Sequence, residues 1–404
     1  MRVLSFSSCF PSSRNPTPGV FVLRRLAALA RRVDLEVVHP KGWFPLLRRR
    51  ARETPEERLS GIRVHHRPFL YVPNILKRFD GRLYAAGLRQ WVTEYCDSHA
   101  VDLMDAHFVW PDGVAVSHLA RHTGLPYTLT LRGTLNSRCR KRGFRSQIAS
   151  ALRGAAAVIS VSRPMADLAA ELGANPEHLH VIPNGVDLDV FRPVPRSEAR
   201  RQLGLSLEGS LLVSVGHILP EKGFTELIEA VTQLPDTTRL AIIGGDTLHR
   251  RYAGRLRRLV RQRGLGGRVS FAGVQPPEVV AAYLSAADVS VLASYSEGCP
   301  NVVLESLACG TPVVATNVGA VPDIVRPGET GELVEPKHVD QLADVLNSAL
   351  DRRWSREAVR QSVANRSWDD VASSVYGVWT GIVHRETNPR DASTARCGDT
   401  ADIV

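Results

Sequence analysis

Cysteines are few in this 404-residue chain: there are six, and none of them forms a C-x-x-C pair or another zinc-binding spacing. They predict reduced thiols, not a disulfide framework or a metal centre. Long hydrophobic runs are also missing, since no stretch approaches the roughly 18 apolar residues that a membrane span needs. The first residues lack the basic segment and apolar run of a secretion signal, so we expect a cytoplasmic protein.

Lysine is scarce, because only five of the 51 basic residues are lysines. The net charge of +10 attracts phosphates, anionic lipids or nucleic acid through its summed field, and charge alone does not choose among them. An apolar fraction of 44% and a charged fraction of 23% are ordinary for a globular protein. The length exceeds what one core usually holds and predicts two domains.

Short β-branched runs alternate with segments of helical period, which predicts an α/β fold of repeated βα units on parallel sheets. In the first half, the expected strands are 3–6, 35–39, 62–66, 101–106, 127–131, 158–161 and 180–182, with helices such as 19–32 and 82–99. In the second half, the expected strands are 211–215, 239–243, 269–272, 289–293 and 312–315, with helices at 224–233, 249–264, 277–286 and 302–309.

A polar segment with two prolines, FRPVPRSE at 191–198, predicts the linker between the two domains. We therefore expect an N-terminal domain over 1–192, a C-terminal domain over 193–375 and a closing segment over 376–385. Residues 386–404 are polar and almost free of large apolar side chains, which predicts a disordered tail.

Two glutamates stand eight residues apart in the segment EGCPNVVLE, from Glu297 to Glu305. Glu297 falls in a loop after a predicted strand, and Glu305 about one turn into the helix that follows Pro300. Proline suits a first helical turn because its missing N–H would have no partner there. The amides of residues 301–303 are then expected to be free donors for phosphate or sugar oxygens. Taken alone, Glu305 is better explained as a cap or salt bridge of its own helix, and Glu297 as a solvated loop charge.

The segment VGHILPEKGF at 215–224 forms a second candidate site. Its strand ends at Gly216, and Lys222 stands just before a predicted helix. An ammonium group and free amides at the carboxyl end of a strand fit a diphosphate. The spacing matches neither G-x-x-x-x-G-K-[ST] nor G-x-G-x-x-G, which disfavours an NTP-hydrolysing P-loop. Taken alone, the segment is better explained by a surface lysine after a tight turn.

Together these segments resemble the family 4 retaining glycosyltransferases. The E-x7-E pattern, the sequence ACGTPVVATNVGAVPDIV at 308–325, the lysine loop and the interdomain signature VIPNGVDLDVFRP at 181–193 carry the resemblance, which covers roughly residues 1–375. It implies the GT-B fold: two facing Rossmann-like domains with an interdomain cleft. It also implies transfer of a sugar from a nucleotide-diphosphate donor to a glycan or lipid-linked acceptor, with retention of anomeric configuration. No cofactor or metal ion is implied.

The resemblance assigns roles to individual residues. Glu305 would hold the ribose of the donor, Glu297 the transferred sugar, and Lys222 the leaving diphosphate. The donor contacts implied in this half are Gly216, His217, Gly273, Pro300, Asn301, Val302 and Glu305. Most of the family has an arginine where this chain has His217, so the leaving group faces one permanent cation fewer.

The N-terminal half departs further from the family pattern. The stretch from Pro16 to Gly19 replaces the usual Gly-Gly pair, so the acceptor loop differs. Arg132 stands where many members have a histidine, and we expect it to clamp charge because a guanidinium cannot accept a proton. Arg132 is the third catalytic candidate, beside Lys222 and Glu297. The acceptor-binding candidates are Gly19, His107 and Asp112; His107 equally fits a satisfied core histidine.

Three further features have plainer interpretations. The motif from Asp187 to Asp189 spells D-x-D, but its place in the interdomain signature predicts turn chemistry and no metal site. The basic run 138–145 can rest on an anionic membrane surface, where each cation gains about 1 kcal/mol. The basic run 250–263 predicts the solvated face of a helix.

Two other classes of function compete with a transferase. A nucleotide-sugar epimerase or another GT-B enzyme such as a sugar phosphorylase shares the fold, although none of the five lysines matches the pyridoxal phosphate lysine of phosphorylases. A non-catalytic basic protein that binds membrane or nucleic acid explains only the charge. The pairing of E-x7-E with the lysine loop favours a transferase whose partner is a nucleotide sugar. We expect this transferase to be cytoplasmic, to contact the membrane only peripherally, and not to bind nucleic acid.

Overall fold

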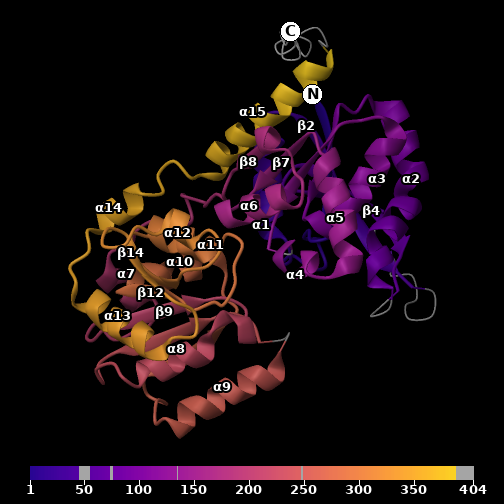
Figure 1. Cartoon of the computed structure of the whole chain (residues 1–404). Coiled ribbons are helices and arrows are strands. Elements are labelled where there is room, and N and C mark those ends of the chain that lie inside the picture. The colour runs from indigo at the N-terminus through magenta and orange to yellow at the C-terminus, as the bar shows by residue number, and fades with distance from the viewer. Residues whose placement is uncertain (45–54, 73–75, 134, 247–248, 388–404) are drawn as a thin grey trace, which may run out of the picture. The chain divides into compact units, whose positions relative to one another are not determined.

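The computed structural model describes residues 1–44, 55–72, 76–133, 135–246 and 249–387. The chain divides into two compact units. The first comprises Met1–Val161, Met165–Ile182 and the residues from Val371 onward, and the second comprises Ser162–Pro164 and Pro183–Asp370. Figure 1 shows both units and labels their α-helices and several of their strands.

The first unit contains a sheet of eight strands within the described residues, in the order β3-β4-β2-β1-β5-β6-β7-β8. The strands are β1 Arg2–Phe6, β2 Asp34–Trp43, β3 Glu56–Leu59, β4 Ile62–Leu70, β5 Leu103–His107, β6 Tyr127–Leu131, β7 Ala157–Ser160 and β8 Leu179–Val181. All neighbours pair in parallel except β3, which pairs antiparallel with β4 at the edge.

Helices alternate with these strands, as the sequence predicts. They are α1 Val20–Leu29, α2 Asp80–His99, α3 Val114–Thr123, α4 Leu135–Cys139, α5 Arg142–Gly154 and α6 Arg163–Glu171, with one-turn segments at Lys77–Phe79, Val109–Gly113 and Pro176–His178. Helices α2, α3 and α5 pack in a row, α2 against α3 and α3 against α5. The last helix, α15 (Trp368–Thr387), belongs to the first unit from Val371 onward, where the buried indole of Trp379 donates to Thr128 of β6 at 3.2 Å.

The second unit has six parallel strands within the described residues, in the order β11-β10-β9-β12-β13-β14. They are β9 Leu211–Val215, β10 Arg239–Ile243, β11 Val269–Gly273, β12 Val289–Leu292, β13 Val313–Thr316 and β14 Gly331–Val334. The helices are α7 Arg196–Gln202, α8 Phe224–Val231, α9 Arg250–Gln262, α10 Pro277–Ala286, α11 Asn301–Ala308, α12 Val321–Ile324, α13 Val339–Asp351 and α14 Arg356–Gln361, with a 3-10 turn at Pro220–Lys222.

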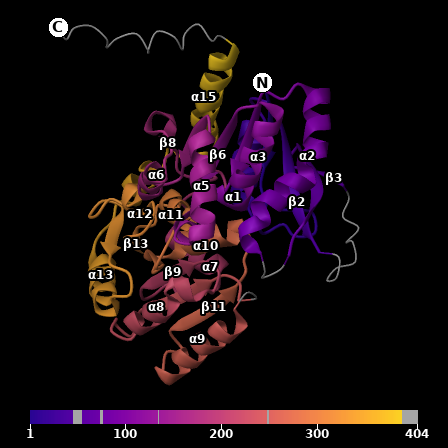
Figure 2. The same ribbon diagram turned by 45° about the vertical axis from the view of Figure 1, so that its right-hand side comes forward.

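Helices cover both faces of this second sheet. Successive residues of β9 belong to different cores: Val213 packs with α7, α10, α11 and α14, whereas Leu212 packs with α8, α9 and α13. Figures 1 and 2 show α8 beside α9 and α13. A strand buried on both faces reads as a nearly continuous apolar run, which is the reason that LLVSV could be recognised as a central strand, and its one polar side chain, Ser214, donates to the Val291 carbonyl.

The predicted α/β fold class is confirmed, and the expected strands lie within a few residues of the observed ones. Two strands, β3 and β14, were not predicted, and neither were five helices of the second half of the chain: α7, α12, α13, α14 and α15. The strand β3 reads EERL and β14 reads GELV, so neither has the apolar run of a buried strand. Helix α15 extends from Trp368 through the expected closing segment 376–385.

The observed boundary between the units differs from the expected one at 192/193. Residues 183–192 belong to the second unit because Val186 and Phe191 are buried in its core and Val186 bridges to Ser367. The first two residues of the expected tail, 386 and 387, lie in α15, and 388–404 are outside the described residues.

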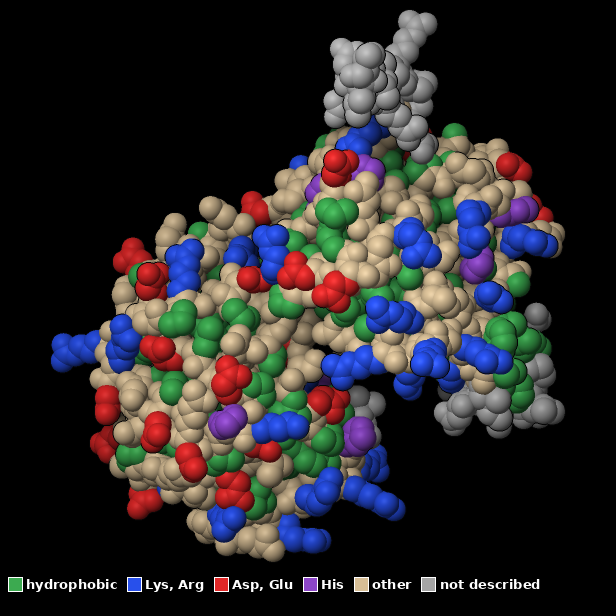
Figure 3. Space-filling model, viewed as in Figure 1, with side chains coloured by type: hydrophobic (Ala, Val, Ile, Leu, Met, Phe, Trp, Pro, Cys, Tyr) green, Lys and Arg blue, Asp and Glu red, His purple; other side chains and the backbone are tan. Residues whose placement is uncertain are grey.

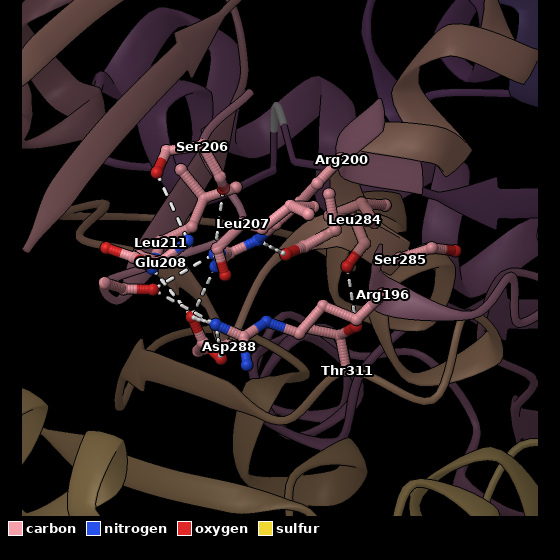
Figure 4. A network of polar contacts seen from close by, with 12 residues as sticks. Arg196, Arg200, Ser206, Leu207, Glu208, Leu211, Leu284, Ser285, Asp288 and Thr311 are labelled. Carbon is pink, nitrogen blue, oxygen red and sulfur yellow. Dashed lines mark hydrogen bonds and ion pairs between the residues drawn. The ribbon is translucent and has the colours of Figure 1, made fainter. Parts of the chain in front are cut away.

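A buried arginine stabilises the start of the second unit (Figure 4). The Arg200 side chain is 2% exposed, and its guanidinium donates to Asp288 at 2.9 Å and to the Ala286 carbonyl at 3.1 Å. One of its nitrogens also lies 3.1 Å from three carbonyls, those of Ser206, Leu207 and Gly209. Asp288 in turn accepts from Arg196 and from the Leu211 amide. The network therefore fixes α7 and the entry to β9.

Arg200→Lys is expected to lower the free energy of unfolding by about 2 kcal/mol, because an ammonium group can pair with Asp288 but cannot reach all the carbonyls. The measurement is urea unfolding followed by circular dichroism. Arg201→Lys is the matched control, since Arg201 is exposed, and it should change stability by less than about 0.5 kcal/mol. Equal stability of the two variants would contradict the role of the network.

Candidate active site

Glycines bring three backbones close together at the carboxyl edge of the second sheet. Gly216 follows β9, Gly244 follows β10 and Gly273 ends β11. A β-carbon on Gly244 would lie 1.9 Å from the Gly216 carbonyl oxygen, so only glycine fits there. Gly244 also donates to the Gly273 carbonyl at 2.8 Å. The sequence analysis singled out Gly216 and Gly273 but missed Gly244.

The loop after β9 carries His217 and Lys222. His217 is exposed, and the next amide, of Ile218, donates to the Gly245 carbonyl at 2.9 Å. The 3-10 turn Pro220–Lys222 then ends at Gly223, whose φ of 66° suits glycine. A β-carbon on Gly223 would lie 1.9 Å from the Ala293 carbonyl oxygen, so this loop packs directly against the end of β12.

Lys222 and Glu297 form an ion pair, which brings two of the predicted catalytic residues together across 75 positions of sequence. The ammonium nitrogen lies 2.6 Å from a carboxylate oxygen, and the side chains are 24% and 11% exposed. Both residues follow neighbouring strands, β9 and β12, whose carboxyl ends lie at the same sheet edge. Because this pair is partly solvated, each group can replace its contact with the other by a contact with a charged, hydroxyl-rich ligand.

The loop that holds Glu297 is fixed by the turn at Gly319. Gly319 has a φ of 58°, and a β-carbon there would lie 2.4 Å from the Glu297 carbonyl oxygen. The next amide, of Ala320, donates to the Gly298 carbonyl at 2.9 Å. The backbone at Gly319 lies so close to that of Glu297 that only glycine fits there, which explains the glycine of the NVGAVPDIV segment.

Helix α11 begins close to this ion pair, with two differences from the prediction. Pro300 occupies the cap position one residue before the helix, not its first turn. The Val303 amide is not free, because it donates to the Pro300 carbonyl at 3.2 Å. Asn301 and Val302 stand in the first turn, and Glu305 lies half-buried one turn further on. The helix start therefore offers fewer free amides than expected.

Asn184, in the interdomain signature, supports this helix start and was missed by the sequence analysis. Its side-chain amide donates to the Asn301 side-chain oxygen at 2.8 Å and to the Cys299 carbonyl at 3.3 Å. The side chain of Asn301 is thus already held by the protein. Asn301 would therefore contact a ligand through its backbone N–H.

In the first unit, Gly19 and Asp112 hold the loop that follows β1. Gly19 caps α1 with a φ of 72°, and a β-carbon there would lie 2.0 Å from the Cys9 carbonyl oxygen. Asp112 is completely buried, and its two oxygens accept from the Ser8 amide at 2.7 Å and the Ser8 hydroxyl at 2.6 Å. Burial raises the pKa of Asp112 to about 7. Asp112, an expected acceptor contact, thus has no exposed surface and is hydrogen-bonded to Ser8.

Asp105, His107 and Arg132 form a buried polar chain at the carboxyl ends of β5 and β6. Asp105 accepts from the hydroxyls of Ser5 at 2.9 Å and Thr128 at 2.8 Å. Nε2 of His107 lies 3.1 Å from Asp105, which leaves Nδ1 as an acceptor 3.5 Å from the Arg132 guanidinium. Asp105 was missed, although a charged residue inside a buried strand is a signal for such a role.

Two arginines give this cluster a positive charge. Arg132 is 3% exposed, and its guanidinium lies 4.7 Å from the centroid of the Phe21 ring. One helical turn beyond Phe21, Arg25 is 1% exposed, and its guanidinium nitrogens make no hydrogen bond to the residues that the structure describes. Burial lowers the pKa of Arg25 to about 10, so it stays charged at neutral pH.

The pKa values follow from burial and from these neighbours. Burial alone would raise the pKa of Asp105, but His107 and Arg25 outweigh it and hold that pKa below the usual range. Burial lowers the pKa of His107 to about 4. His107 is therefore neutral at physiological pH, which keeps Nδ1 available to Arg132. The net charge of the cluster suits an anionic group in a ligand.

His107 is expected to contribute a loss of stability on acidification, whereas the raised pKa of Asp112 acts in the opposite direction over the same range. The pKa of His107 falls from 6.5 to about 4 on folding, so the unfolded state binds the proton first and stability is lost as pH falls through this window. At 1.36 kcal/mol per pKa unit, the contribution of His107 between pH 7 and pH 5 is a loss of about 2 kcal/mol. In urea unfolding, the stability of His107→Gln relative to the wild-type chain should therefore rise by about this amount from pH 7 to pH 5. If the free energy of unfolding changed with pH in the same way in the wild-type chain and in His107→Gln, a buried, neutral His107 would be contradicted.

The remaining predicted features are structural or lie at the surface. Asp187 accepts from the amides of Asp189 and Val190, both at 3.2 Å, so the D-x-D motif forms a turn as expected. The run 250–263 lies on α9, which buries only Tyr252, Ala253, Leu256 and Val260 and presents its arginines to solvent, as predicted. Among the described helices, none is both long and apolar enough to cross a membrane.

The fold and these residues define a class of protein before any comparison. A parallel sheet covered on both faces carries a lysine, a paired glutamate and a helix start at its carboxyl edge, which is where α/β proteins bind nucleotides. Comparison with known proteins then identifies the family. The family model for group 1 glycosyl transferases matches residues 195–366, and that for the glycosyl transferase 4-like domain matches residues 17–185.

Relatives of known sequence agree with these matches. A putative teichuronic acid biosynthesis glycosyltransferase of Bacillus subtilis is 31% identical over 86% of this chain and 88% of its own length. A D-inositol 3-phosphate glycosyltransferase of Acidothermus cellulolyticus is 34% identical over 59% of this chain, and the match spans about half of that relative's length, 55%. The chain therefore belongs to the family 4-type glycosyltransferases, and it is a glycosyltransferase.

Solved structures agree on the fold. A sucrose-phosphate synthase of Thermosynechococcus elongatus has a TM-score of 0.74 at 22% identity, covering 98% of this chain and 99% of that one. Anabaena HepE in complex with UDP has a TM-score of 0.70 at 21% identity, covering 97% and 99%. These likenesses confirm the GT-B fold, with a Rossmann-like domain in each unit.

Proposed function

We propose that this glycosyltransferase moves a sugar, with retention of anomeric configuration, from a nucleotide-diphosphate donor to a hydroxyl of a glycan or lipid-linked acceptor. The observation that carries the proposal is the 2.6 Å pair of Lys222 and Glu297 at the carboxyl edge of the second sheet. A nucleotide sugar offers each partner a new contact: the diphosphate for the ammonium group, and the sugar hydroxyls for the carboxylate. The complex of HepE with UDP supports a donor of this kind.

Departure of the nucleoside diphosphate is the step that this arrangement assists. Lys222 neutralises the charge that develops on the leaving oxygen, together with the amides of Asn301 and Val302. Glu305, one turn along the same helix, holds the ribose. The acceptor hydroxyl then attacks from the face that the diphosphate leaves, through a short-lived oxocarbenium-like pair. Glu297 orients the sugar through hydrogen bonds to its hydroxyls.

We further propose that the reaction needs no metal ion and no cofactor. Lys222 and the helix amides supply the positive charge that a divalent cation provides in other transferases. Activity in the presence of EDTA checks this proposal.

The acceptor side supports a negatively charged or lipid-linked substrate. Arg25 and Arg132 give the cluster near the loop after β1 its positive charge. Basic side chains also gather near α4 and α5 of the first unit (Figure 3), where the run 138–145 lies. We propose that this surface contacts anionic lipid, which would place a cytoplasmic enzyme at the membrane. By analogy with the Bacillus relative, the pathway would be cell-surface polysaccharide or glycoconjugate biosynthesis.

The anomeric configuration of the released sugar tests the proposal. Without an acceptor, slow hydrolysis of an α-linked donor should release the α-anomer first, and proton NMR can observe it before mutarotation. Initial release of the β-anomer would contradict retention. An epimerase would instead change the sugar without releasing nucleoside diphosphate, which the same spectra separate from transfer.

A further inference from the structure

A groove lies on the second unit, away from the loops that follow β9, β11 and β12. Those loops carry the predicted donor contacts and are called the donor loops below. Its volume is about 780 Å³, within the range of about 300 to 1,000 Å³ that small-molecule sites usually have. Its walls are the turn 326–330 before β14, the link 352–355 between α13 and α14, and residues 358–366. The turn precedes β14, whereas the donor loops follow β9, β11 and β12. The groove therefore lies at the opposite edge of the parallel sheet.

Positive charge dominates the lining of this groove. Four arginines line it, and Glu329 is the only acidic residue among the lining residues. Glu329 pairs with Arg326 at 3.7 Å, but both side chains are more than half exposed, so this pair contributes little. Figure 3 shows basic side chains at the edge of the second unit near α13 and α14. The field in the groove favours an anion.

Arg352 is held in place for such a contact. One guanidinium nitrogen lies 3.2 Å from Glu332, which also accepts from the Gly328 amide at 3.1 Å. The guanidinium lies 4.7 Å from the centroid of the Trp354 ring, and the indole itself donates to the Ala349 carbonyl at 2.8 Å. The wall of the groove thus presents an oriented guanidinium next to an aromatic ring.

Two more arginines have donors to spare. Nη2 of Arg366 lies 3.4 Å from the Asp323 carbonyl, whereas its Nη1 is buried and makes no hydrogen bond to any described residue. Arg353 is exposed and forms no ion pair within the described part of the chain. An exposed guanidinium without an ion pair, as in Arg353, keeps its donors for a ligand, and Arg366 adds a further positive charge to the lining of the groove.

We propose that this groove binds an anionic oligosaccharide, that is, sugar rings that bear carboxylate or phosphate groups. The guanidinium groups of Arg352, Arg353 and Arg366 would bind the anions. The amides of Gln361 and Asn365, which also line the groove, would bind ring hydroxyls. The inference rests on the proposed function, because the ligand would be a glycan that the enzyme extends. Binding there would hold the glycan on the enzyme between successive transfers.

The test is titration of the full chain with tetragalacturonate by isothermal calorimetry at low salt. We expect saturable binding that Arg353→Glu weakens at least about tenfold, because a charge-assisted hydrogen bond is lost and a repulsion is introduced. Arg258→Glu, which reverses an exposed charge on α9, should weaken binding less than about twofold. Equal weakening by both variants, or no binding at millimolar ligand, would overturn the proposal.

Two further arms of the experiment define the ligand. Maltotetraose, which is neutral, should not bind, and inorganic phosphate should compete only weakly. Phosphate that binds as tightly as tetragalacturonate would overturn the assignment to a saccharide. The titration is repeated with Glu297→Ala and with saturating UDP. Tetragalacturonate binding that persists while donor turnover is lost separates the groove from the donor site, so each proposal can fail without the other.

Discussion

Lys222→Met is expected to lower kcat for donor turnover by about 10² to 10³, the usual cost of removing one group that stabilises a developing negative charge. Lys222 is 24% exposed and makes one ion pair, so its replacement should leave the fold intact. The KM for the nucleotide sugar should change less than kcat, because the charge on the leaving oxygen grows in the transition state. The measurement is steady-state release of nucleoside diphosphate.

Lys141→Met is the matched control, since Lys141 is an exposed lysine of the first unit. Its turnover in solution should equal that of the wild-type chain. Glu297→Gln should also lower turnover, because the amide keeps the shape of the side chain but loses the charge that orients Lys222. Full activity of either Lys222→Met or Glu297→Gln would remove the ion pair from the mechanism.

Arg132→Ala is expected to lower kcat/KM for transfer to the acceptor by about 10² to 10³, because the proposed contact between this desolvated guanidinium and an anionic acceptor is lost. Arg132 lies at the end of β6, with Phe21 on one side and His107 on the other. Arg132→Lys should recover only part of the activity, since an ammonium group cannot present the planar fork. Acceptor-dependent kinetics measure both variants.

Asp105→Asn tests whether the buried chain positions Arg132. The amide can no longer fix the tautomer of His107, so we expect about a tenfold loss of transfer and a changed pH profile below pH 7. Asp97→Asn, at an exposed position of α2, is the control and should leave both unchanged. Donor hydrolysis without acceptor should stay near wild type in Asp105→Asn if the fold is intact. A loss of transfer with an unaltered pH profile would mean that Asp105 acts only on stability.

The sequence could predict most of the fold because buried parallel strands leave a simple pattern. Runs such as LLVSV and VVAT are mostly apolar and are buried on both faces, and helical segments separate them. The edge strand β3 could not be predicted in this way, since half of EERL faces solvent. The helix α15 does carry a pattern: its buried residues Val371, Val375, Trp379 and Ile382 recur every three or four positions. Ser and Gly residues between them hide it.

The candidate site could be predicted in part. The residues Lys222 and Glu297 follow strands that are adjacent in the sheet, so their proximity follows from topology once the strand order is known. The 2.6 Å contact depends on the close packing of Gly223 and Gly319 against neighbouring carbonyls, which no local pattern reports. Likewise, Ser8 and Asp112 lie 104 positions apart, and nothing in either segment signals their hydrogen bond.

The most direct test of the central claim is nucleoside diphosphate release from a panel of UDP-, GDP- and ADP-sugars with EDTA present. The wild-type chain is compared with Glu297→Ala and Lys222→Ala. We predict that one donor is hydrolysed slowly by the wild-type chain, that both variants lose this activity, and that the same donor protects the wild-type chain against thermal unfolding. A chain that neither turns over nor is protected by any donor at millimolar concentration would contradict a donor site at the Lys222–Glu297 pair.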